Sequence, residues 1–225
     1  MKKTLKHFLP ILCMIAAIAV LTLAAAAATE TGSCGTDLTY TLDTETGVLT
    51  VSGTGTHIQK PTLSDSSLVR SIVIPEGVRS MMYNAFSDCG NLESITIPTT
   101  LTTVLAQTFG SCEKLNAVHI SDLAAWAKHS FIDAASSPLY YAHHLYLNGE
   151  LVTEVALPEG TEYLNSYSFA GCTDLVSVTI PARVSSIGLG VFYGCTNLQT
   201  ITVSDDNTMY VCENNVLMDA ERTNV

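Results

Sequence analysis

A short alternation of apolar and polar residues recurs along most of this chain. Residues 92–98 (LESITIP) carry apolar side chains at the first, fourth and sixth positions. The fourth and sixth alternate with polar residues, as side chains on one face of a β-strand do. The proline that follows ends the strand, because proline cannot donate a hydrogen bond to a sheet. Each copy therefore predicts a short strand with one buried face.

The copies follow one another at a step of 23 residues, except across one longer unit. Copies that keep the proline begin at Val69, Leu92, Val152 and Leu175, and copies that lack it begin at Leu115 and Leu198. A phenylalanine stands three residues before a cysteine in the pairs Phe86/Cys89, Phe109/Cys112, Phe169/Cys172 and Phe192/Cys195. One unit cannot bury its apolar face alone, whereas stacked units bury a continuous core. The pattern predicts a mainly β solenoid of about six turns with parallel strands on one side.

Three segments carry a family resemblance: residues 74–78 (IPEGV), 169–175 (FAGCTDL) and 178–181 (VTIP). They resemble the BspA-like class (type 5) of leucine-rich repeats of bacterial surface proteins, over roughly residues 68–218. The commoner leucine-rich consensus has Asn or Cys where this pattern has proline. The resemblance implies a right-handed solenoid with short helical turns. It also implies a secreted or surface-attached protein that binds or adheres to other cells or host molecules.

The repeat is not evident over residues 29–67. Residues 38–42 and 47–52 alternate with period two around a polar turn, which predicts a β-hairpin. A hairpin here would cap the open end of the stack, so we predict a β-hairpin cap over 29–67 and the solenoid over 68–225. Near the other end, Asn214-Asn215 marks a possible second hairpin. It would either close the stack or precede further chain.

The first 28 residues have the features of an export signal. Lys2, Lys3 and Lys6 precede an apolar stretch that ends in alanines, which are suitable for signal-peptidase cleavage. An uncleaved membrane anchor is the alternative, and would be the only contact with a membrane. Cleavage leaves 7 Lys+Arg against 21 Asp+Glu, a formal charge of −14. This charge disfavours nucleic acid as a partner, and the signal predicts a secreted or cell-surface location.

One unit is longer than the others, because Leu115 and Val152 are 37 residues apart. Within this insertion, at about 121–150, Ser121 is predicted to cap a short helix and Asn148-Gly149 predicts a hairpin. The insertion concentrates ring side chains: Trp126, Tyr140, Tyr141, His143, His144 and Tyr146. Insertions often form part of a solenoid's binding face, and aromatic side chains often anchor interfaces. These residues are candidate ligand contacts, unless they only cover the irregular turn.

The outward strand positions form another candidate surface, which is rich in hydroxyl groups and nearly uncharged. It includes Thr96, His119, Thr179 and Thr202. Such a surface could bind a protein or glycan on another cell or in the extracellular matrix. We predict a binding or adhesion protein; the alternative is a structural spacer for a C-terminal module.

Catalytic patterns are sparse. Ser121 and Asp122 are close to His119 in sequence, but His119 occupies an outward strand position. No cysteine and histidine spacing typical of zinc sites occurs. We therefore expect a protein that is not an enzyme and uses no metal or cofactor. The four repeat cysteines are expected to be packed thiols, with a Cys89–Cys112 or Cys172–Cys195 disulfide as the alternative.

Overall fold

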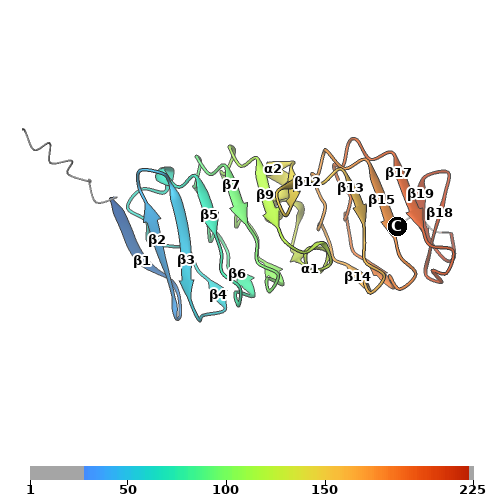
Figure 1. The fold of residues 1–225 in the computed structure, drawn as a ribbon, viewed down its shortest axis with the longest axis horizontal. Coiled ribbons are helices and arrows are strands. Elements are labelled where there is room, and N and C mark those ends of the chain that lie inside the picture. Colours follow the sequence, from blue (N-terminus) through green and yellow to red (C-terminus); the bar gives the residue numbers. More distant parts are fainter. Residues whose placement is uncertain (1–27, 223–225) are drawn as a thin grey trace, which may run out of the picture.

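The computed structural model describes residues 28–222, and its elements stack in chain order along one long axis (Figure 1). The predicted solenoid is confirmed, with about 7 turns. The segment predicted as a signal peptide, apart from residue 28, lies outside the described residues. Within residues 28–222, no helix is long and apolar enough to cross a membrane.

Two sheets form one side of the stack, and the outward-facing side chains of their strands cover it. We call this side the front face. Its first sheet has the order β1 (Thr29–Gly35), β2 (Leu38–Asp43), β3 (Val48–Gly53), β5 (Ser71–Val73), β7 (Ser94–Thr96), β9 (Ala117–Ile120), β11 (Leu145–Leu147) and β12 (Glu150–Leu151). Its second sheet has the order β13 (Glu154–Ala156), β15 (Ser177–Ile180) and β17 (Thr200–Val203). From β3 to β11 and within the second sheet, neighbouring strands are parallel.

Shorter parallel strands form a second layer. They are β4 (His57–Ile58), β6 (Ser80–Met81), β8 (Thr103–Val104) and β10 (Ser130–Phe131) in one sheet, and β14 (Tyr163–Leu164) and β16 (Ser186–Ile187) in another. The helical turns are η1 (Ser66–Leu68), α1 (Leu123–Ala127), η2 (Ala134–Ser136) and α2 (Leu139–Ala142). Loops then return the chain to the front face. We call the side of the stack that these loops form the loop side.

The N-terminal cap is larger than predicted and is continuous with the repeats. The predicted hairpin is β2 and β3, and β1 adds a third, antiparallel strand. However, β3 also pairs in parallel with β5, with Val48 opposite Ser71, 23 residues later. The repeat therefore begins within β3, and the boundary predicted at residue 68 is too late. The shift was missed because residues 46–52 lack the terminal proline.

The core lies between the strand layers and the loops. Inward strand residues such as Ile72, Ile95 and Val118 are buried. Behind them, the rings of Phe86 and Phe109 stack with centroids 6.4 Å apart, and the same column recurs in later turns. Burial of matched apolar side chains from turn to turn is what the repeat pattern predicts.

The repeat cysteines are packed thiols, as expected. All six cysteines in the described part of the chain are free. The Cys112 Sγ donates to the Phe86 carbonyl oxygen at 3.3 Å, and the Cys195 Sγ donates to the Phe169 carbonyl oxygen at 3.1 Å. Desolvation by burial raises the pKa of Cys112 and of Cys195 to about 12.

These thiols should react slowly in the folded protein. The thiolate is the reactive form, so at pH 8 we expect modification of Cys112 by a disulfide reagent to be about a thousand-fold slower than in the unfolded chain. Thiol titration with and without denaturant measures this. A Cys89–Cys112 disulfide would instead remove two titratable thiols and make the unfolding midpoint depend on reductant.

A second hairpin, β18 (Tyr210–Glu213) and β19 (Val216–Asp219), packs on the last turn. Leu217 joins the core cluster, and the Ile201 amide donates to Asn215 Oδ1 at 2.9 Å. Buried Asn207 donates to the carbonyl oxygens of Pro181 and Val184, and its Oδ1 accepts from the amides of residues 209 and 210. The hairpin thus packs against the last turn of the stack.

Candidate functional site

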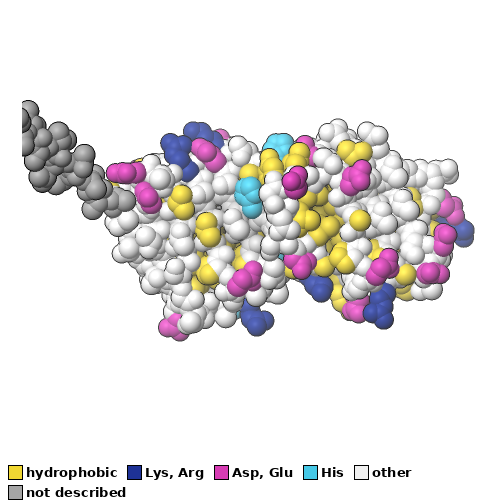
Figure 2. All heavy atoms as spheres, viewed as in Figure 1, with side chains coloured by type: hydrophobic (Ala, Val, Ile, Leu, Met, Phe, Trp, Pro, Cys, Tyr) yellow, Lys and Arg dark blue, Asp and Glu magenta, His cyan; other side chains and the backbone are white. Residues whose placement is uncertain are grey.

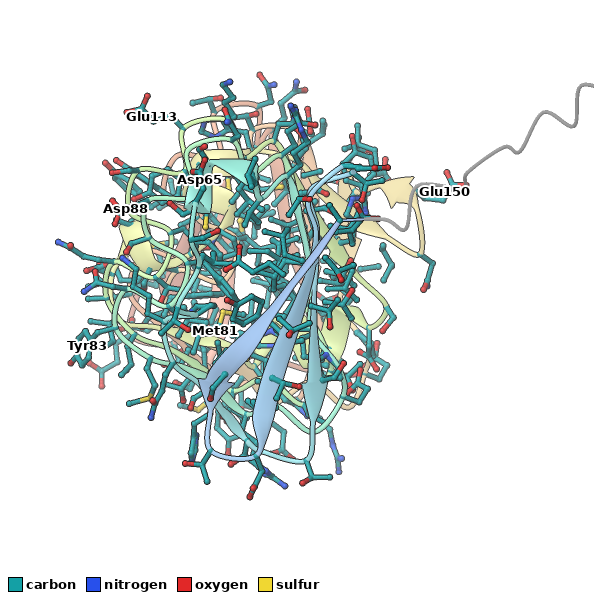
Figure 3. The ribbon with its side chains drawn as sticks, turned by 90° about the vertical axis from the view of Figure 1, so that its left-hand side faces the viewer. Asp65, Met81, Tyr83, Asp88, Glu113 and Glu150 are labelled. Carbon is teal, nitrogen blue, oxygen red and sulfur yellow. The ribbon has the colours of Figure 1, made fainter. Side chains whose placement is uncertain are left out.

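The insertion interrupts the front face. Its predicted hairpin is β11 and β12, with Asn148 and Gly149 in the left-handed region at φ 52° and 88°. β12 ends the first front sheet, and β13 begins the next. Viewed from the N-terminal end, Glu150 of this hairpin projects from the opposite side of the stack to Tyr83 and Asp88 (Figure 3). The hairpin of β11 and β12 therefore projects from the front face at the end of the first sheet, and we call it the hairpin wall.

The short helix of the insertion has a different cap from the one predicted. The α1 N-cap is Asp122, whose Oδ1 accepts a hydrogen bond from the Ala125 amide at 2.9 Å. Ser121 lies one residue earlier, just after β9. Serine and aspartate are comparable N-cap residues, so local sequence did not distinguish them.

A row of side chains crosses the first sheet toward this wall. Strand register aligns Thr50, Val73, Thr96, His119, Tyr146 and Leu151, which we call the front row. The rings of His119 and Tyr146 stack at 5.1 Å, and Leu151 is 43% exposed. The front row contains no Lys, Arg, Asp or Glu. Figure 2 shows hydrophobic side chains gathered around the hairpin, with histidine side chains beside them.

The other two predicted strand positions lie across the interruption. Thr179 of β15 aligns with Ala156 and Thr202 in the second front sheet. Both threonines are exposed, as outward positions should be. The structure therefore brings together Thr96, His119 and Tyr146, and it places Thr179 and Thr202 on a separate sheet.

Trp126, a predicted ligand contact, is instead a core residue. Its exposed fraction is 0%, and its ring lies 5.1 Å from that of His129 and 5.7 Å from that of Phe131. Position 126 on the inner side of α1 leaves it no surface for a partner. It fills the interior of the irregular turn, which is the alternative that the sequence left open.

The remaining ring residues of the insertion do not join the front row. Tyr140 and Tyr141 follow one another in α2, and their rings meet edge to face at 5.3 Å. The His143 Nδ1 lies 3.0 Å from the Gly171 carbonyl oxygen. The His144 Nδ1 lies 2.5 Å from Asp174 Oδ2. The two histidines thus contact the turn that follows the insertion.

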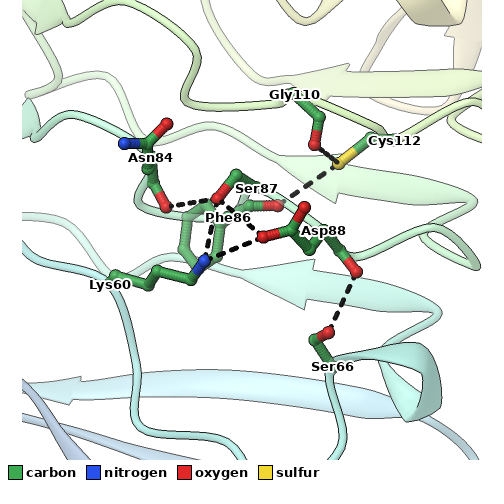
Figure 4. Close-up of polar contacts among 8 residues, drawn as sticks. All are labelled: Lys60, Ser66, Asn84, Phe86, Ser87, Asp88, Gly110 and Cys112. Atoms are coloured by element: carbon green, nitrogen blue, oxygen red, sulfur yellow. Dashed lines mark hydrogen bonds and ion pairs between the residues drawn. The ribbon is translucent and has the colours of Figure 1, made fainter.

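A serine next to a lysine was not anticipated from the sequence. Lys60 Nζ lies 3.0 Å from Ser87 Oγ and 3.0 Å from Asp88 Oδ2. Figure 4 shows both contacts as dashed lines. The hydrogen bond and charge of Lys60 lower the pKa of Asp88. A lysine ammonium has three donors and no lone pair, so it cannot accept a proton from serine. Because Ser66 Oγ also donates to the Asp88 carbonyl oxygen at 2.9 Å, this cluster joins neighbouring turns.

Within residues 28–222, no group of three or more His, Cys, Asp and Glu side chains could hold a metal ion. The front row offers hydroxyl, ring and apolar groups in a flat array, which suits contact with another molecule's surface.

Parallel strands on one face, a phenylalanine and cysteine column behind them and a 23-residue step define a leucine-rich-repeat solenoid. The family described as BspA type leucine rich repeat region matches residues 44–138 and 142–219, in 6 copies. The chain belongs to this family. The match begins within the N-terminal hairpin, in agreement with the early start of the parallel ladder, and its gap lies inside the insertion.

One solved structure shares the fold, and a second is similar in sequence. A leucine-rich repeat protein from Eubacterium ventriosum is 23% identical with a TM-score of 0.52, over 85% of this chain and 48% of that one. A leucine rich cell surface protein from Faecalibacterium prausnitzii is 20% identical with a TM-score of 0.39, over 85% of this chain and 59% of that one. This chain thus spans about half the length of these relatives. No curated protein matches the sequence.

Proposed function

We propose that this chain is a secreted or cell-surface binding protein, and that the front row and its hairpin wall recognise a protein or glycan outside the cell. The observation that carries the proposal is the His119–Tyr146 stack, which lies in register with Thr96 and beside the exposed Leu151. The proposal includes no catalytic step.

The composition of the front row supports binding. Ring side chains bury a large area with few rotatable bonds, so they lose little entropy when a partner immobilises them. The neighbouring short side chains, such as Thr96 and Ser94, let a partner approach the sheet closely. The absence of ionised groups along the row spares a partner the cost of desolvating charges.

Two observations support the location. The N-terminal sequence has the order of charged, apolar and small residues found in export signals. An acidic surface, with a formal net charge of −11 for the whole chain, suits a soluble extracellular domain.

The proposal predicts that a double substitution, His119→Ala with Tyr146→Ala, weakens binding at least about thirty-fold, as expected when hot-spot rings are removed. Residues 29–225 would be applied to an array of extracellular proteins and glycans, and the affinity for each captured molecule would then be measured. Circular dichroism would verify that the variant folds.

Tyr163→Ala is the matched control, because Tyr163 is an exposed tyrosine on β14 of the other layer. It should leave the affinity unchanged. The proposed site would be contradicted if the array captured no molecule. It would also be contradicted if the double substitution left the affinity for a captured partner unchanged.

A further inference from the structure

A second concave surface lies on the loop side and is separate from the front row. Tyr140, Tyr167 and Tyr193 line it, as two adjoining hollows of about 490 and 310 Å³ that share Tyr140 and Tyr193. Leu189 and Asp133 are among the other residues that line the larger hollow. We call this surface the tyrosine cleft. Its combined size is suited to a small molecule or to a few side chains of a partner.

The cleft lies where the insertion meets the next two turns. Tyr140 belongs to α2 of the insertion, Tyr167 follows β14, and Tyr193 follows β16. Leu189 occupies the repeat position of Tyr83, which Figure 3 shows on the loop side, away from the sheet. A ligand in the cleft would therefore leave the front row accessible.

Tyr167 is held in a conformation that is costly for a bulky residue. Its φ is 60°, and the matching positions of other turns, Asn84, Gln107 and Gly190, have φ of 58°, 58° and 59°. Asparagine and glycine tolerate this left-handed region, whereas tyrosine is strained there. The repeat imposes this conformation at each of these turns, whatever residue occupies the position. The ring that it positions forms part of the cleft.

Two glycines make room for the rings. A Cβ on Gly190 would lie 2.7 Å from Tyr167 Cε1, so the ring lies directly against the glycine backbone. A Cβ on Gly171 would lie 2.8 Å from Tyr140 Cα, and this close approach holds α2 against the following turn. The cleft is therefore formed by tightly packed backbone, which preorganises the rings for a ligand.

The charge of the cleft is one-sided. Asp133 supplies a carboxylate to the larger hollow, and the residues that line the two hollows include His143 but neither lysine nor arginine. The Asp133 Oδ1 accepts from the Ser136 amide at 2.7 Å, which fixes the carboxylate at the start of η2. Tyrosine faces carry negative electrostatic potential and attract cations. The lining thus complements positive charge and repels anions.

We infer that the tyrosine cleft binds an arginine side chain of a protein partner. A guanidinium group is planar, so it can stack on a tyrosine face while it donates hydrogen bonds to Asp133. Three exposed or half-exposed rings around one carboxylate provide both interactions. The cleft would add a second contact to the proposed binding function, and it can be tested independently of the front row.

The test uses two short peptides, acetyl-Gly-Arg-Gly-amide and the same peptide with neutral citrulline in place of arginine. Titration into protein with labelled tyrosine rings, followed by nuclear magnetic resonance, reports binding at the cleft. We expect the arginine peptide to shift the ring signals and to bind about ten-fold more tightly than the citrulline peptide.

Substitutions at Tyr193, which is 61% exposed, separate ring electrostatics from shape. Tyr193→Phe keeps the aromatic face and should keep most of the binding, whereas Tyr193→Leu should lose it. Tyr83→Leu is the matched control, because Tyr83 is equally exposed on the loop side but does not line the cleft. It should bind as the parent does.

Tyr167→Asn distinguishes loss of arginine binding from loss of folding. It installs the residue found at the matching position 84, so the melting temperature should stay the same or rise while arginine binding weakens. Methyl glucoside serves as a sugar probe in the same titration. The proposal would be overturned if the two peptides bound with equal affinity, or if methyl glucoside shifted the ring signals and the arginine peptide did not. It would also be overturned if the ring signals did not shift at all. Binding that survives Tyr193→Leu would do the same.

Discussion

Trp126→Ala should lower the free energy of unfolding by about 3–5 kcal/mol, the range for large-to-small changes of a buried tryptophan. Trp126 is completely buried, and its ring contacts those of His129 and Phe131 inside the irregular turn. Its removal would leave a cavity where the insertion joins two halves of the front face. Chemical denaturation followed by far-ultraviolet circular dichroism measures the change without relying on tryptophan fluorescence.

Tyr140→Ala is the control for Trp126→Ala, since both remove a ring from the same insertion. Tyr140 is exposed, so its replacement should change stability by less than about 1 kcal/mol. A Trp126→Ala protein as stable as Tyr140→Ala would show that position 126 is not part of the core. In that case the prediction that Trp126 anchors a partner at the surface would regain support.

Acidification should destabilise the protein through His129. This side chain is 1% exposed, and desolvation by burial lowers its pKa from 6.5 to about 4. Its Nδ1 lies 2.9 Å from the Trp126 carbonyl oxygen, so a neutral ring protonated at Nδ1 fits the contact. Below pH 6.5 the unfolded chain binds a proton at this histidine, whereas the folded chain does not until about pH 4.

The free energy of unfolding should therefore fall by about 2 kcal/mol between pH 7 and pH 5, before most carboxylates titrate. Denaturation at a series of pH values measures the slope. His129→Leu removes the titrating group and should flatten the slope in this window. An unchanged slope in that variant would assign the pH dependence to other groups.

The agreement between sequence and structure follows the repeat. Strands such as β7 and β15 lie where the apolar alternation placed them, because each turn contacts only its neighbours and the pattern is local. The hairpin at Asn148-Gly149 was predictable for the same reason, since the turn chemistry is contained in two residues. The early start of the repeat at β3 was missed because the strand there lacks the marker proline.

The candidate surfaces were only partly predictable. Outward strand positions identified Thr96 and His119, and strand register then added Tyr146 to the same row. The tyrosine cleft was not predicted, because Tyr167 and Tyr193 belong to ordinary turns and meet Tyr140 only when the stack is assembled. The left-handed positions of the repeat, visible as Asn84 and Gln107, were the signal that could have drawn attention to Tyr167.

Local sequence patterns were sufficient to predict the solenoid, the position of most strands and the inward column of phenylalanine and cysteine. These features depend on the period of the pattern and on short-range geometry. Three other features became evident only in the assembled fold: Trp126 is buried, the front face is split, and three tyrosines from different turns share a cleft. Whether a side chain is covered depends on the residues that the 37-residue unit brings opposite to it, and no local pattern contains that information.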